Sequence, residues 1–122
     1  MAIYVLRVCD RFEAAHQLRS YRGAPEPLHG HSWRVEVVLE AERLDAEGMA
    51  FDFVEIRGAL AELCARFHHR NVNEVEPFDT LAPTTENLAT WFCERLAARL
   101  PTAGVAEVTI WEGPDCSATY RP

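Results

Sequence analysis

Lysine is absent from this chain of 122 residues, so all 12 of its basic residues are arginines. Without a lysine amine on a side chain, enzymes that form a Schiff base through lysine are excluded. The arginines are scattered and form no basic run, and the formal net charge is −7. The sequence therefore lacks the positive patch that nucleic-acid-binding proteins carry, and we predict no nucleic-acid partner.

Long apolar runs are missing as well. No segment approaches the roughly 18 consecutive apolar residues that suggest a membrane span, so we expect no membrane partner. The first residues alternate like a strand and have no basic stretch typical of a signal peptide. We therefore expect a cytoplasmic protein whose residues 1–122 form one domain.

The four cysteines form no Cys-x-x-Cys pair. They are Cys9, Cys64, Cys93 and Cys116. Wide spacing in a cytoplasmic chain favours free thiols over disulfides or a thiolate metal site, and we expect most of them to be buried.

Hydrophobic periodicity predicts the order of elements. Alternating residues predict strands over 2–13, 31–42, 105–112 and 117–121. Asp52 reads as the N-cap of a helix whose apolar face continues to Phe67, and a second helix begins at Thr84 or Thr85 and ends before Pro101. The resulting ββααββ order predicts an α+β fold, with an antiparallel sheet and two helices on one face. Exposed edge strands in so small a domain favour a homo-oligomer.

Three of the five histidines fall within 16 residues, and they are the strongest chemical signal in the chain. His29 and His31 share one face at the start of a predicted strand, and the Gly30 between them has no side chain that could crowd an ion. His16 ends the preceding strand, so antiparallel pairing would bring the three imidazoles together. Three neutral nitrogen donors with an open fourth position suit a catalytic Zn²⁺.

Other polar residues are candidates with ordinary alternatives. Glu26 lies just before the histidine pair and could transfer protons, or it could be a solvated loop residue. His68 and His69 are adjacent in a loop, where one could act as a general acid or base while the other is solvated. Glu112 ends an apolar strand and is either a surface carboxylate or a bidentate acceptor for a planar pair of N–H groups.

Several motifs occur together in a known order. They are Phe12-x-Ala14-Ala15-His16, Leu28-His29-Gly30-His31-Ser32-Trp33, Asp52-Phe53, His69-Arg70-Asn71-Val72-Asn73, Pro83-Thr84-Thr85-Glu86-Asn87 and Trp111-Glu112. With them the chain resembles the 6-pyruvoyl-tetrahydropterin synthase family, whose bacterial branch contains 6-carboxy-tetrahydropterin synthase of queuosine (7-deazapurine) biosynthesis.

The resemblance implies a tunnelling fold in which subunits join their sheets into a barrel. It also implies a homohexamer built from two trimers, with active sites at subunit interfaces. Zinc would be held by His16, His29 and His31, and Glu112 would anchor the pterin ring. Thr84, Thr85 and Glu86 would lie near that ring, and the substrate would be 7,8-dihydroneopterin triphosphate.

The chain departs from the family pattern at two positions. Pro25 occupies the place of the family's catalytic cysteine, and His68 occupies that of the aspartate in its Asp-His dyad. A subgroup without the cysteine carries Glu-x-Leu-His-Gly-His, which is similar to Glu26-Pro27-Leu28-His29-Gly30-His31 here. That subgroup cleaves the side chain to 6-hydroxymethyl-dihydropterin, on the folate route.

Three functional hypotheses follow. The first is a zinc-dependent lyase similar to 6-carboxy-tetrahydropterin synthase, in which Glu26 and His69 move protons and His68 belongs to the same catalytic set. The second is the folate-route cleavage that Glu26 indicates. The third is a zinc- and pterin-binding protein that has lost catalysis.

Overall fold

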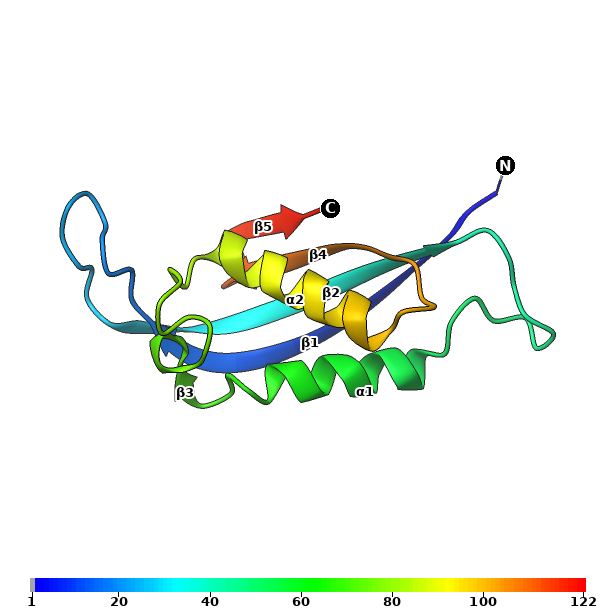
Figure 1. The fold of residues 1–122 in the computed structure, drawn as a ribbon, viewed down its shortest axis with the longest axis horizontal. Helices are drawn as coiled ribbons and strands as arrows, with labels where there is room; N and C mark the ends of the chain where they lie inside the picture. The colour runs from blue at the N-terminus through cyan, green and yellow to red at the C-terminus, as the bar shows by residue number, and fades with distance from the viewer. Residues whose placement is uncertain (1) are drawn as a thin grey trace.

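One five-stranded sheet, in the order β3-β1-β2-β4-β5, forms the centre of the computed structural model, which describes residues 2–122. The strands are β1 (Tyr4–His16), β2 (His29–Ala41), β3 (Arg70–Asn71), β4 (Val105–Glu112) and β5 (Ser117–Tyr120). The helices are α1 (Phe53–Cys64), the short 3-10 helix η1 (Val72–Glu74) and α2 (Thr85–Arg99). Figure 1 shows α1 and α2 running along the sheet and the β1–β2 loop extending beyond one end of it.

The β1–β2 ladder fixes the geometry of that end. The two strands pair antiparallel in one unbroken register from Tyr4 opposite Ala41 to His16 opposite His29. Because side chains alternate between faces, every second residue of each strand shares a face with the histidines. The two strands therefore carry one apolar stripe that ends in imidazoles.

That stripe forms the side of the hydrophobic core that the sheet contributes. Phe12 and Trp33 are fully buried and stacked 5.8 Å apart, and Phe12 is also stacked on Phe92 of α2. α1 packs against β1, and α2 packs against β4 and β5, so both helices cover the same face of the sheet. No helix within residues 2–122 is long and apolar enough to cross a bilayer.

Both helix starts agree with the sequence. The Asp52 carboxylate accepts the N–H of Val54, and the Thr84 hydroxyl accepts the N–H of Asn87, which caps two helix ends where backbone N–H groups lack partners. α1 ends at Cys64 rather than at Phe67, although Phe67 is still fully buried, through the turn that follows the helix.

The sheet differs from the prediction in one respect. Residues 70–71, which none of the four predicted strands includes, form β3 and pair with Ala14 and Ala15 of β1 in parallel, so the sheet is mixed rather than antiparallel. A strand of two residues has no periodicity that a sequence pattern could reveal, and only its contact with β1 defines it.

The thiols also differ in part from expectation. All four cysteines are free, and Cys64 and Cys93 are buried under the helices as predicted. Cys9 and Cys116 are exposed, because β1 turns Cys9 toward the face that neither helix covers and Cys116 lies in the turn before β5.

Candidate metal centre and substrate pocket

The three histidines that the sequence singled out meet at one end of the sheet. One ring nitrogen from each of His16, His29 and His31 lies within 4.8 Å of the other two. His16 ends β1 directly opposite His29, and His31 follows two residues later on the same face of β2. The predicted convergence is therefore confirmed by the register of the ladder.

Hydrogen bonds to the main chain orient two of these rings. Nδ1 of His16 lies 2.9 Å from the carbonyl oxygen of Pro83, and Nδ1 of His29 lies 2.8 Å from that of Pro27. A carbonyl can only accept, so each Nδ1 must carry the proton. In the neutral rings both Nε2 atoms then present lone pairs, and these atoms are 3.1 Å apart.

Two facing lone pairs repel each other unless a cation lies between them. Zn–N bonds of about 2.0–2.1 Å in a tetrahedral site place two nitrogens about 3.3 Å apart, close to the observed separation. A carbonyl that accepts from the far nitrogen is also the usual support of a metal-bound imidazole. The residues present therefore fit a metal ion.

His31 supplies the third donor. Its Nε2 is buried and makes no hydrogen bond within the described part of the chain. Burial lowers the pKa of His31, the Glu112 carboxylate opposes this effect, and His16 and His29 reinforce it. A lowered pKa keeps the ring neutral at neutral pH, which is the form that binds metal.

Glu112 lies beside the histidines and completes the polar end of the core face. Its two oxygens are 3.7 Å from Nε2 of His16 and 3.5 Å from Nε2 of His31. The Thr85 hydroxyl donates to Oε2 of Glu112 at 3.2 Å, which links the start of α2 to the end of β4. Oε1 accepts none of the side-chain hydrogen bonds found within residues 2–122, so the carboxylate can still receive a planar ligand edge.

A pocket of about 370 Å³ opens over this cluster. It is lined by His16, Leu18, Tyr21, Glu26, His29, Thr84, Thr85, Glu86 and Glu112. The structure thus brings together two of the triad histidines, Glu26, Glu112 and all three residues of the Thr-Thr-Glu motif. Leu18 and Tyr21 were not predicted, because their loop has no periodic pattern to place them.

Glu26 is held in the loop by its neighbours rather than being free in solvent. Its Oε1 accepts the N–H of Leu18 at 3.0 Å and lies 3.9 Å from Nε2 of His29. The main chain of Glu26 also pairs with Leu18, and its carbonyl accepts from the amide of Gln17. Pro25 is exposed beside it, and none of the four cysteines lines the pocket.

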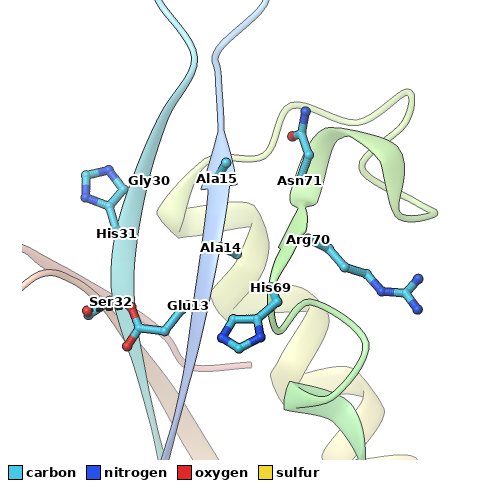
Figure 2. Close-up of a pocket in the computed structure, with 9 residues that line it drawn as sticks. All are labelled: Glu13, Ala14, Ala15, Gly30, His31, Ser32, His69, Arg70 and Asn71. Carbon is cyan, nitrogen blue, oxygen red and sulfur yellow. Dashed lines mark hydrogen bonds between the residues drawn. The ribbon is translucent and has the colours of Figure 1, made fainter.

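His68 and His69 do not line this pocket. His69 lines a second pocket of about 510 Å³, which Figure 2 shows between β1, β2 and β3. Glu13, Ser32 and Arg70 line it too, and His31 is the only triad member there. Within one chain, the structure separates the adjacent histidines from Glu26 and Glu112.

Gly30 faces this second pocket rather than the metal site, since it lies between two residues of the opposite face. A Cβ at Gly30 would meet only the carbonyl oxygen of Ala14 at 3.7 Å and the Cα of Ala15 at 4.0 Å. Our expectation that Gly30 leaves space for the ion was wrong, because the side chain would point away from it.

Comparisons with known proteins point to one family. A family model described as 6-pyruvoyl tetrahydropterin synthase matches residues 5–122. A dihydroneopterin monophosphate aldolase of Pyrococcus furiosus is 35% identical over 103 residues, which cover 84% of this chain and 83% of the aldolase. A 6-carboxy-5,6,7,8-tetrahydropterin synthase of Synechocystis is 35% identical over 99 residues, covering 77% and 72% of the two chains.

Solved structures agree with the fold. The 6-pyruvoyl tetrahydropterin synthase of Caenorhabditis elegans superposes with a TM-score of 0.86 at 28% identity, covering 100% of this chain and 97% of the other. A Plasmodium vivax 6-pyruvoyltetrahydropterin synthase, solved as a catalytic-residue mutant with glutamate replaced by alanine, gives a TM-score of 0.81. Its identity is 21%, over 100% of this chain and 99% of that one, which shows a shared fold alone.

Proposed function

Because this chain belongs to the 6-pyruvoyl tetrahydropterin synthase family and has its tunnelling fold, we propose that it is a zinc-dependent pterin lyase. Its substrate would be a phosphate ester of 7,8-dihydroneopterin, either the triphosphate or a close relative. Its product would be 6-hydroxymethyl-dihydropterin. The observation that carries this choice is the Glu26 carboxylate beside the histidine triad, in a pocket that no thiol lines.

His16, His29 and His31 would hold the zinc ion. When bound, zinc would act as a Lewis acid that polarises the hydroxyl oxygens of the substrate side chain. The chain supplies three imidazole donors and leaves a fourth position for substrate, the pattern of catalytic rather than structural zinc.

Glu112 would bind the pterin. Its carboxylate can accept two parallel N–H bonds from the 2-amino-4-oxo-pyrimidine edge, a charge-assisted contact that also orients the ring. Thr85 holds one carboxylate oxygen, and Thr84 and Glu86 line the same wall. The side chain of a pterin bound in this way would extend toward the triad and Glu26.

Glu26 would be the base of a retro-aldol step. It would remove the proton of the 2′-hydroxyl, after which the C1′–C2′ bond breaks and the phosphorylated two-carbon fragment leaves as an aldehyde. The electron pair passes from the broken bond into the conjugated pterin ring, and a proton added at C1′ gives the hydroxymethyl product. His69 is our candidate donor for that proton.

His69 lies outside the triad pocket of its own chain, so this role requires a second copy of the chain at the site. We therefore include assembly into a homohexamer of two trimers in the proposal. Mass measurement of the native protein, with and without dilution, tests the assembly independently of activity.

Relatives support the choice of reaction. The P. furiosus protein, which is 35% identical to this chain, is named a dihydroneopterin monophosphate aldolase. The second candidate is 6-carboxy-tetrahydropterin synthase, on the queuosine route, because the similar Synechocystis protein carries that name.

Product analysis decides between these reactions. Purified zinc-loaded protein is incubated with 7,8-dihydroneopterin triphosphate and monophosphate, and the pterins are identified by mass spectrometry. A hydroxymethyl pterin together with a phosphorylated glycolaldehyde supports the proposal, whereas a 6-carboxy pterin supports the second candidate. Tight pterin binding without turnover would instead identify a protein that has lost catalysis.

A further inference from the structure

The main chain of Glu13 makes two unusual contacts with the paired histidines. Its N–H donates to Nδ1 of His68 at 3.0 Å, and its carbonyl oxygen accepts the N–H of His69 at 2.7 Å. The regular β1–β3 pairing begins one residue later on β1, with Ala14 opposite Arg70. Nδ1 of His68 thus accepts the Glu13 N–H in the position where a backbone carbonyl of β3 would accept it if the pairing continued by one residue.

This contact fixes the protonation of the His68 ring. A nitrogen that accepts an N–H bond carries no proton, so a neutral His68 must hold its proton on Nε2. Protonation of Nδ1 would break the bond and leave the Glu13 N–H without that acceptor. His68 is therefore poorly suited to shuttle a proton through Nδ1, although the sequence placed it with the catalytic residues.

The backbone of His69 has a conformation that residues other than glycine rarely adopt. Its φ is +59°, in the left-handed region, which costs a non-glycine residue free energy that contacts with its surroundings must offset. The two imidazole rings are stacked, with centroids 3.8 Å apart and planes inclined by 26°. The Glu13 carbonyl therefore fixes the His69 main chain, while the His68 ring supports its side chain (Figure 2 shows His69 and Glu13).

We propose that His68 is a positioning residue, whose Nδ1–Glu13 bond and ring stack hold the His69 imidazole ready for proton transfer. The catalytic use of His69 rests on the proposed function, whereas the tautomer and the stack of His68 do not. A merely structural alternative is that His68 only ties β3 to β1, in which case its loss would change stability but not the chemistry.

Two variants separate the hydrogen bond to His68 from the stacking of its ring on His69. His68→Asn keeps an acceptor for the Glu13 N–H but removes the ring, and His68→Phe keeps a ring but removes the acceptor. The matched control is Arg43→Ala, an exposed position far along the chain from both pockets. For each variant we would measure folding by circular dichroism, the zinc content, and kcat and KM against pH.

We expect both His68 variants to bind zinc, to keep KM within about twofold and to lose about tenfold or more in kcat, with a changed pH profile. A long-range ¹H–¹⁵N spectrum of the wild-type protein should show His68 unprotonated at Nδ1. A proton on Nδ1 would overturn the proposal, as would unchanged kcat and pH profile in both folded variants.

His69→Asn separates this failure from failure of the proposed function. If His69→Asn keeps full activity, the proton-donor role of His69 is wrong, and the proposal for His68 falls with it even if its tautomer is as expected. If His69→Asn is inactive while both His68 variants keep wild-type kcat, only the positioning role is refuted.

Discussion

Replacing Glu26 by glutamine should remove the base and keep the loop. The Oε1 of Glu26 accepts the N–H of Leu18 at 3.0 Å, and a glutamine oxygen can accept the same bond. A hydrogen bond to the charged carboxylate stabilises the fold by about 1 kcal/mol more than one to a neutral amide. Partial exposure of this site to solvent reduces that difference. The variant should therefore fold and bind zinc like the wild type.

The effect on catalysis should be much larger. A positioned general base contributes about 100- to 10,000-fold to the rate, which corresponds to about 3–5 kcal/mol of activation free energy. We expect kcat to fall by that factor for Glu26→Gln, with KM changed little because the proposed function assigns the main contact with the pterin ring to Glu112. Steady-state turnover with product detection by mass spectrometry, together with zinc content and thermal unfolding, measures all three quantities.

Glu55→Gln is the matched control, since Glu55 is an exposed residue in the first turn of α1. Its kcat should equal that of the wild type. Full activity in a folded, zinc-loaded Glu26→Gln protein would refute the assignment of Glu26 as the base.

Three further predictions concern the metal, the pterin and the core. Zinc should raise the melting temperature of the wild type, by an amount equivalent to about 2.7 kcal/mol at one hundred times Kd, and should not raise that of His29→Ala, as scanning fluorimetry would show. Glu112→Gln should raise KM about 10- to 100-fold through loss of the charged acceptor, and an unchanged KM in a folded variant would contradict a pterin-binding role. Burial raises the pKa of Cys64 to about 12, so the unfolded thiol ionises first. The free energy of unfolding should therefore be unaffected below about pH 9 and fall by about 1.4 kcal/mol per pH unit above it, until the pH passes the folded pKa. Denaturant titrations of Cys64→Ala should show a shallower alkaline slope than the wild type, and equal slopes would argue against a buried thiol.

The sequence was most informative where local chemistry and periodicity coincide. The strand over 105–112 and the Asp52 cap are confirmed to the residue, and Thr84 caps the helix that was expected to begin at Thr84 or Thr85, because alternation and capping side chains are local signals. The histidine triad is confirmed as a cluster, since antiparallel pairing places His16 at the end of β1 beside His29 and His31 at the start of β2.

Two features that the sequence missed are tertiary. β3 is defined by its contact with Ala14 and Ala15 and not by a pattern of its own. The same is true of the bond from the Glu13 N–H to His68, which joins residues 55 positions apart. Gly30 was misplaced because we considered its size and not the face of the strand to which it belongs.

The antiparallel register of β1 and β2 has a consequence for how this protein folds. A slip of one residue would turn His16 away from His29 and carry the apolar stripe of one strand to the wrong face. The native alignment brings three ring nitrogens together, and the slip of one residue would separate them, so metal binding would favour the native alignment over that slip. In the proposed enzyme, the metal ion would therefore stabilise the correct pairing of β1 and β2 in addition to its part in the reaction.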